Sequence, residues 1–266
     1  PMSYSYGFSV INTHLARGGS IVPNNYSLID KKFWKLYNVA APSNINGVPF
    51  FYDMLTKVGF ERVLENRPKF LTLAGGKVNK KTFQNIANKC LQNDITFYLM
   101  YGQTEASPRI SYHKVKKEDL VVNNIPIGKA ILGGEIDLRD NNGLLIKDQN
   151  TEGELIYKGR NIFGGYAESY KDLKSLKNNL ELRTGDMGIK DKFENFYITG
   201  RKSRFVKIYG YRINLDYLEE KLNLQDTTAA CIGLNEKIYI FLSKNLPNIE
   251  DIINLPKNTY KVSILK

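Results

Sequence analysis

Five residues in the middle of the chain, Tyr101-Gly102-Gln103-Thr104-Glu105, carry groups that could bind a nucleotide. An aromatic ring can stack on a base, a glycine lets the backbone approach a phosphate, and a hydroxyl can hydrogen-bond that phosphate. The Glu105 carboxylate could hold Mg²⁺, which prefers oxygen ligands. The apolar run at residues 95–100 predicts a buried strand leading into these residues. Taken alone, the pattern is equally typical of an ordinary turn at the end of a strand.

Three further motifs follow along the chain and favour the nucleotide site. They are Gly153-Glu154-Leu155 with Gly164-Gly165-Tyr166, then Arg183-Thr184-Gly185-Asp186, then Gly200-Arg201 running on to Lys207, Gly210, Arg212 and Ile213. Together with the first motif, this ordered series resembles the adenylate-forming superfamily of acyl-CoA synthetases, peptide-synthetase adenylation domains and luciferases. The resemblance spans most of the chain.

The resemblance implies an AMP-forming acid ligase that uses ATP, Mg²⁺ and a carboxylic acid to make an acyl-adenylate. A thiol, from coenzyme A or from phosphopantetheine on an acyl carrier protein, would then displace AMP. Thr104 would bind the α-phosphate and Glu105 would hold the metal, so both are expected to be catalytic. Tyr101 would stack on adenine beside Gly102. Such catalysis consists mostly of positioning and charge neutralisation.

The resemblance also implies further nucleotide contacts. The backbone of Gly75-Gly76, at the end of a short apolar strand, would line the adenine and acyl groups. Asp186 would bind both ribose hydroxyls, because a carboxylate can accept two hydrogen bonds from a vicinal diol. Arg201 would contact the same ribose. An aspartate that only caps its own turn is the ordinary alternative for Asp186.

Residues for the acyl pocket are expected at two places. Tyr4 best matches the aromatic side chain that walls this pocket in the family, and Tyr6 would be a second wall. Core packing is the alternative for both tyrosines. Arg109 follows the metal carboxylate, where the family usually has small or apolar residues, so it could pair with a second carboxylate or polar group of the substrate. For Arg109, a structural salt bridge is the favoured alternative.

Periodicity predicts the elements that position these residues. Helical spacing indicates helices over 31–37, 50–58 and 80–92, and apolar runs indicate strands over 70–74 and 95–100. A helix followed by a short strand is expected within 5–22, and a loop over 38–49. Residues 1–106 are thus predicted to be the α/β portion of a large adenylation domain, as part of a doubly wound sheet layer. The predicted fold class is α/β.

The remainder of the chain is predicted to be rich in strands. Residues 107–200 should form a β-rich subdomain, a small β-barrel or curled sheet, with a hairpin around Asn142-Gly143. Residues 201–203 match the family's hinge, although Ser203 stands where the family usually has aspartate or lysine. Residues 204–266 should form an incomplete small α+β domain, with a strand over 205–213, a helix over 214–222 and strands over 229–234 and 237–243. The resemblance places Lys207 and Gly210 on the thiol-acceptor side.

Two expected family features are missing from the sequence. The phosphate loop should lie upstream of Tyr4, and the catalytic lysine should follow soon after Ser263-Ile264, whereas the chain ends at Lys266. No motif around Lys266 supports that role. We therefore expect this chain to be a fragment of a longer ligase. A catalytically silent nucleotide-binding remnant of the same family is the open alternative.

The formal net charge of the 266 residues is +11. This charge suits an anionic partner such as nucleic acid, a membrane surface, coenzyme A or an acidic carrier protein. The lysines are scattered, however, which favours a general compositional bias, and no nucleic-acid-binding motif is present. We expect no nucleic acid partner.

The cysteines and the apolar runs of the sequence predict the cellular compartment of the protein. No stretch approaches the roughly 18 continuous apolar residues of a membrane span, and the first residues lack the features of a signal peptide. Cys90 and Cys231, the only cysteines, are far apart in the sequence, which favours a reducing compartment. A cytoplasmic location is predicted.

Overall fold

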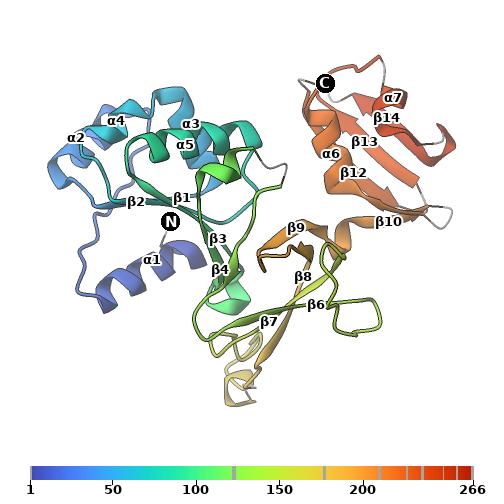
Figure 1. Ribbon diagram of the computed structural model, residues 1–266, viewed down its shortest axis with the longest axis horizontal. Coiled ribbons are helices and arrows are strands. Elements are labelled where there is room, and N and C mark those ends of the chain that lie inside the picture. The colour runs from blue at the N-terminus through green and yellow to red at the C-terminus, as the bar shows by residue number, and fades with distance from the viewer. Residues whose placement is uncertain are drawn as a thin grey trace.

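The computed structural model describes residues 2–121, 124–175, 178–208, 211–225, 227–234, 237–247, 249–255 and 257–264. Figure 1 shows a sheet covered by helices in the N-terminal half, a second sheet beside it, and a separate group of strands and helices at the C-terminal end. Within the described residues, the helices fall short of the length and apolar character that a bilayer span requires.

The N-terminal half is built on a five-stranded sheet in the order β1-β2-β3-β4-β5. Its strands are β1 (Asn44–Gly47), β2 (Phe70–Leu73), β3 (Thr96–Gly102), β4 (Arg109–Lys114) and β5 (Lys129–Ala130). The first three strands are parallel, and β4 and β5 are antiparallel to their neighbours. Helices α3 (Pro49–Val58) and α5 (Lys80–Gln92) connect the parallel strands and cover one face (Figure 1). The predicted α/β layer is confirmed.

Local sequence explains where these helices begin and what they bury. Pro49 opens α3 at a position where its missing N–H costs nothing. The side chain of Asn79 accepts a hydrogen bond from the Lys81 N–H and so caps α5. The buried face of α5 packs into a core with side chains of β2 and β3, and it comprises Phe83, Ile86, Ala87 and Cys90. Helices α2 (Lys31–Ala40) and α4 (Glu61–Leu64) contribute to the same core.

Helix α1 (Ser5–Ala16) lies below this sheet in the view of Figure 1, away from α3 and α5. Side chains alternate along a strand, so Leu71 and Leu73 enter the helical core while Thr72 points the other way. The Thr72 hydroxyl is 2.6 Å from the Tyr6 hydroxyl of α1. Tyr6 is therefore fixed against β2.

Two N-terminal predictions are wrong. Residues 19–27 form neither helix nor strand, so the short strand expected there is absent, and β1 lies inside the expected loop 38–49. The segment Asn-Ile-Asn-Gly has no apolar alternation of its own. It becomes a strand because its backbone pairs with β2 from Asn44 to Gly47.

The β-rich region contains a four-stranded antiparallel sheet in the order β6-β7-β8-β9. These strands are β6 (Glu135–Arg139), β7 (Gly153–Lys158), β8 (Glu181–Lys190) and β9 (Phe196–Arg201). In the described ranges β6 and β9 do not pair, so the expected small barrel is an open sheet. The outer edge of β9 instead bonds to the chain that enters β5, through a bridge between Phe196 and Gly128. This contact joins the two sheets and leaves the second one unclosed.

The turn expected at Asn142-Gly143 forms, but the second strand of the expected hairpin does not, because residues 144–146 make only an isolated bridge from Leu145 to Arg139. Gly143 has a φ of +83°, and its N–H donates to the carbonyl of Asp140. On the far side, the Ile146 N–H donates to the Leu138 carbonyl at 2.8 Å.

Strands β4 and β5 continue the first sheet beyond residue 106. They are separated by the 3₁₀ turn η2 (Lys117–Leu120), and a further turn, η3 (Asp172–Ser175), lies between β7 and β8. Tyr101 and Ile110 belong to the buried cluster of the β-rich region, with Leu155 and Phe196. The domain boundary expected at residue 106 therefore passes through shared structure, and the division into domains stays a prediction.

The C-terminal part forms a core of its own around α6 (Leu215–Asn223). The single strand expected over 205–213 is a hairpin of β10 (Phe205–Ile208) and β11 (Tyr211–Asn214). The other expected strands are confirmed as β12 (Ala229–Leu234) and β13 (Lys237–Leu242), which β14 (Tyr260–Ile264) extends in the order β12-β13-β14. The remaining elements are α7 (Ile249–Ile253) and η5 (Lys257–Thr259).

Substitution of Gly102 tests how tightly the end of β3 packs against the neighbouring chain. A Cβ at this position would lie 1.7 Å from the carbonyl oxygen of Pro108, which directly precedes the paired strand β4. We expect Gly102→Ala to lower the free energy of unfolding by at least about 2 kcal/mol, because the backbone must move apart. Chemical denaturation checks this. In Gly76→Ala the nearest atom is 3.4 Å away, so a change within about 0.5 kcal/mol is expected. Equal stability of the two variants would contradict the tight packing.

Candidate active site

The chain after β3 forms a sharp turn that exposes two polar side chains. Residues Thr104–Ala106 make the 3₁₀ turn η1, and Ser107 then takes a left-handed conformation with a φ of +52°. Thr104 is exposed and Glu105 is half-buried. Parallel strands place their carboxyl ends at one edge of a sheet, which is where such sheets bind ligands. The first motif is therefore presented at the ligand-binding edge.

The glycine pair after β2 lies at the same edge. Gly75 has a φ of +88°, which favours glycine. A Cβ on Gly75 would come within 2.9 Å of the Tyr4 hydroxyl, so Tyr4 lies directly beside this glycine. Tyr4 is 41 % exposed. The structure thus brings Tyr4 and Gly75 together, while the roles expected for them stay predictions.

Helix α1 also contacts the turn after β3. The Thr104 hydroxyl donates to the Ser5 hydroxyl at 3.1 Å. Four residues along α1, the Ser9 hydroxyl accepts from the Arg109 guanidinium at 3.2 Å. The same helix therefore touches the turn at Thr104 and the strand that leaves it.

Tyr101, Asp186 and Arg201 form one linked group. The Tyr101 hydroxyl donates to Asp186 Oδ2 at 2.6 Å, and Arg201 Nε is 3.2 Å from Asp186 Oδ1. Asp186 and Arg201 are direct neighbours across β8 and β9. Asp186 is only 6 % exposed, whereas the Arg201 side chain is 70 % exposed. A buried carboxylate is thus held between the two sheets.

Burial raises the pKa of Tyr101 well above its ordinary value of 10.0, and the negative charge of Asp186 raises it further. Tyr101 therefore stays protonated and acts as a donor. A carboxylate has roughly four acceptor sites, and the protein contacts just described use one on each oxygen. Asp186 can accept further hydrogen bonds from a ligand.

Glu105 is held from the loop after β7. Its carboxylate accepts a hydrogen bond from the Tyr166 hydroxyl, and its carbonyl accepts from the Phe163 N–H at 2.9 Å. The two rings of that loop contact edge to face, with centroids 4.9 Å apart. The motif at 164–166 therefore packs on the first motif, although 58 residues of chain lie between Glu105 and Gly164.

A family model described as "AMP-binding enzyme" matches residues 1–167, which is more than half of the chain. The chain belongs to this AMP-binding enzyme family.

Individual relatives agree with the family. The chain is 25 % identical over 266 residues to the D-alanine–D-alanyl carrier protein ligase of Listeria monocytogenes, covering 93 % of this chain and 51 % of that protein. It is 31 % identical over 144 residues to the beta-alanine-activating enzyme of Danio rerio, covering 52 % of this chain and 12 % of that protein. The chain spans about half the length of the D-alanyl carrier protein ligases that it matches.

Solved structures share the fold. O-succinylbenzoate coenzyme A synthetase from Bacillus subtilis in complex with AMP superposes with a TM-score of 0.78 at 20 % identity, covering all of this chain and 56 % of the other. The same enzyme in complex with ATP and magnesium gives a TM-score of 0.76 at 18 % identity.

Asn161 is a site residue that the sequence analysis missed. Its side-chain amide donates to the carbonyls of Ala106 and Arg109, the latter at 2.8 Å, and accepts from the Tyr157 hydroxyl at 2.7 Å. It thereby fixes both ends of the turn that carries the family's carboxylate. Its place between two matching motifs, at 153–155 and 164–166, is the one signal the sequence offers.

Glu154 links the second and third motifs to residues 201–203, where the hinge is expected. Its buried carboxylate pairs with Arg183 at 2.7 Å and with Lys202 at 2.9 Å. Burial raises the pKa of Glu154, but the hydrogen bonds from Lys202 and Arg183 outweigh it, so the pKa lies below the ordinary 4.5. The strand before Asp186 and the turn η4 (Lys202–Arg204) are therefore held by one charge.

Arg204 fixes the turn η4 to the C-terminal core around α6. Its guanidinium donates to Asp216 at 2.7 Å and to Glu219 at 2.5 Å, and also to the Cys231 carbonyl at 2.8 Å. Of the residues expected on the thiol-acceptor side, Gly210 lies outside the described residues, and so does the side chain of Lys207. Their placement stays a prediction.

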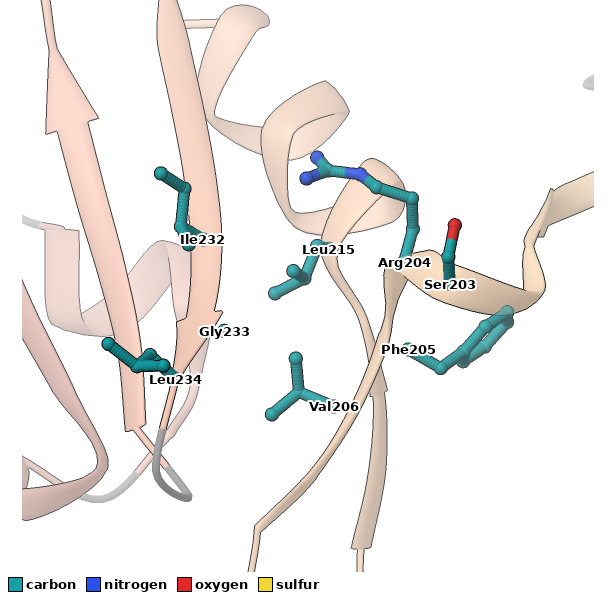
Figure 2. A pocket seen from close by; sticks show the side chains of 8 residues that line it. All are labelled: Ser203, Arg204, Phe205, Val206, Leu215, Ile232, Gly233 and Leu234. Carbon is teal, nitrogen blue, oxygen red and sulfur yellow. The ribbon is translucent and has the colours of Figure 1, made fainter. Parts of the chain in front are cut away.

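A hollow of about 370 Å³ lies between η4, β10 and β12 in the C-terminal part (Figure 2). Figure 2 shows Val206 and the Arg204 guanidinium pointing toward β12, which carries Ile232 and Leu234, whereas the Phe205 ring points away from that strand. The hollow is lined in addition by Ser203, Leu215 and Gly233. Apart from Ser203 of the expected hinge, no residue predicted for the active site lines it.

The metal-binding capacity of the site rests on Glu105. The described part of the chain contains no group of three or more His, Cys, Asp or Glu side chains able to hold a metal ion. Mg²⁺ commonly takes one or two carboxylates and completes its shell with substrate phosphates and water. A single half-buried carboxylate at the binding edge fits that mode.

We expect Glu154→Gln to destabilise the protein by about 2 kcal/mol at pH 7, because Arg183 and Lys202 lose a buried charged partner. The folded-state pKa of Glu154 is depressed below 4.5, so its stabilisation is present above that value and is lost as the pH falls through the folded-state pKa. The difference between wild type and variant should therefore shrink below pH 4.5. Urea unfolding at several pH values measures it. The exposed Glu118→Gln serves as control, and a difference that is constant with pH would contradict the charge pairing.

Proposed function

We propose that this chain is part of an AMP-forming acid ligase, which activates a carboxylic acid with ATP and passes the acyl group to a thiol. The observation that carries the proposal is the buried Asp186 carboxylate, bound by Tyr101 and Arg201 next to the turn of Thr104 and Glu105. Residues from distant motifs converge there, at the edge where family membership predicts the nucleotide.

In the proposed site, Asp186 accepts hydrogen bonds from the two ribose hydroxyls through its remaining acceptor positions. Arg201 keeps the carboxylate charged and oriented. Tyr101, which is 9 % exposed, supplies the ring that stacks on adenine. The backbone of Gly75-Gly76 lines the other side of the base. Support for these roles comes from the shared binding edge and from the contact between Tyr101 and Asp186.

The proposed reaction begins when a carboxylate oxygen of the acid attacks the α-phosphorus of ATP. A P–O bond forms to the acid and the P–O bond to pyrophosphate breaks, giving acyl-adenylate and pyrophosphate. Thr104 donates a hydrogen bond to the α-phosphate, and Gly102 and Glu105 keep the turn in place. Mg²⁺ held by Glu105 would neutralise phosphate charge.

In the second half-reaction, a thiol loses its proton to water and its sulfur attacks the acyl carbon, a C–S bond forms, and AMP leaves with the C–O electron pair. We propose that residues 204–266 rotate about 201–203 and bring residues 207–210 to the site. The named relatives act on a carrier protein or on coenzyme A, and either acceptor is anionic. The net charge of +11 suits both. A cytoplasmic location is supported by two unbonded cysteines in separate cores.

The test is pyrophosphate release from ATP over a panel of carboxylic acids. It is run on this chain and on the full-length protein that contains it. The Glu105→Ala variant of each is measured alongside. We expect turnover by the whole protein and a loss of about 100-fold or more in the variant, because the developing phosphate charge loses its metal. The exposed Glu118→Ala is the matched control. Binding of AMP without turnover of any acid would refute the ligase and favour the silent remnant.

Tyr166 gives a second test of the metal site. Its hydroxyl donates a hydrogen bond to a Glu105 carboxylate oxygen and therefore competes with a metal ion for that oxygen. We expect Tyr166→Phe to lower the Mg²⁺ concentration needed for half-maximal ATP binding, measured by calorimetry. Tyr170→Phe, on the same segment and also exposed, should leave it unchanged. An unaltered Mg²⁺ dependence in Tyr166→Phe would contradict the proposal that Glu105 binds the metal.

A further inference from the structure

Arg109 is a half-buried cation at the binding edge. It is the first residue of β4, four positions after Glu105, and its carbonyl is held by the Asn161 amide at 2.8 Å. The backbone that carries this arginine is thus fixed together with the turn of Thr104 and Glu105.

The guanidinium lies on one face of α1. Its Cζ is 4.6 Å from the centroid of the Tyr6 ring, and its Nη2 donates to the Ser9 hydroxyl at 3.2 Å. Tyr6 and Ser9 are themselves buried, and each is tied down by hydrogen bonds, Tyr6 to Thr72 and Ser9 to the Tyr6 carbonyl. A rigid platform therefore holds the cation in one place.

No carboxylate pairs with Arg109 among the residues that the structure describes. Arg204, which is also half-buried, shows the ordinary arrangement, with carboxylates of Asp216 and Glu219 on either side. Burial lowers the pKa of Arg109, because its charge is less well solvated here than in water. A guanidinium has five N–H donors, and Ser9 takes one. The site lacks an anion.

We propose that this anion is a second carboxylate of the substrate, and that the acid activated here is a short dicarboxylic acid. The inference rests on the proposed ligase function and names its substrate class. Arginine and carboxylate form two parallel hydrogen bonds, which suits recognition of one end of a diacid. The carboxylate at the other end then reacts near Thr104.

Helix α1 sets the length of that acid. Ser5 contacts Thr104 at the reacting end, and Ser9 contacts Arg109 at the binding end. Four residues of α-helix rise about 6 Å, roughly the separation of the carboxyl carbons in the five- and six-carbon diacids. A monocarboxylic acid of equal length would leave Arg109 unpaired.

The experiment measures kcat/KM for pyrophosphate release by the whole protein with diacids of increasing length. Each diacid is compared with its monoamide, which has the same length and one charge fewer. We expect wild type to prefer the diacid by about 100-fold, with an optimum at the five- or six-carbon acids. Arg109→Met should abolish the preference, and Arg109→Lys should keep part of it. Arg17→Met, at the exposed end of the same helix, should retain it fully.

Two results would overturn the inference. One is equal use of diacid and monoamide by wild type, a measurement that needs no variant. The other is an equal loss on all acids in Arg109→Met, as expected for a structural arginine. If no acid is turned over, the ligase proposal fails, and this failure does not by itself decide whether Arg109 binds an anion. Calorimetry of diacid binding then tests the anion site. Binding to wild type that is lost in Arg109→Met upholds the anion site, and absence of binding refutes it.

Discussion

The structure around the binding edge depends on a single buried carboxylate. Asp186 lies between the two sheets, and its charge is tolerable there because Tyr101 donates a hydrogen bond to it and Arg201 forms an ion pair with it. Tyr101 comes from β3 of the first sheet, while Asp186 and Arg201 come from β8 and β9 of the second. The contact therefore sets how the strand end that carries Thr104 and Glu105 faces the second sheet.

Polar side chains outside the predicted site stabilise this arrangement. Asn161 bonds to both ends of the turn after β3, and Tyr166 reaches the Glu105 carboxylate from the same loop. Glu154 connects Arg183, which precedes Asp186, to Lys202 in the hinge turn. The proposed ligase would need such support, because loosely held groups lose most of the benefit of positioning. The motifs are thus joined by contacts that motif matching does not reveal.

The C-terminal core around α6 is bonded to the turn η4 and to the end of β9, where the Asn214 amide donates to the Thr199 carbonyl at 2.7 Å. Arg204 bonds to Asp216, Glu219 and the Cys231 carbonyl, so η4 belongs to the α6 core. Lys77, just after the glycine pair, pairs with Glu220 of α6 at 2.7 Å, but both side chains are exposed. Exposed pairs contribute only about 0–1 kcal/mol. The rotation proposed for residues 204–266 would therefore lose little by breaking this pair.

The sequence alone determined the class of fold and the set of motifs. Apolar periodicity specified α5 and β2 because each buries a regular face, and the order of motifs specified the family. Tertiary structure decided the rest. Strand β1 exists through pairing with β2, and the second sheet stays open because β9 bonds to Gly128. The contacts of Arg109 with Ser9 and of Tyr101 with Asp186 join residues 100 and 85 positions apart. Such contacts depend on how the sheets and α1 pack, which no local pattern encodes.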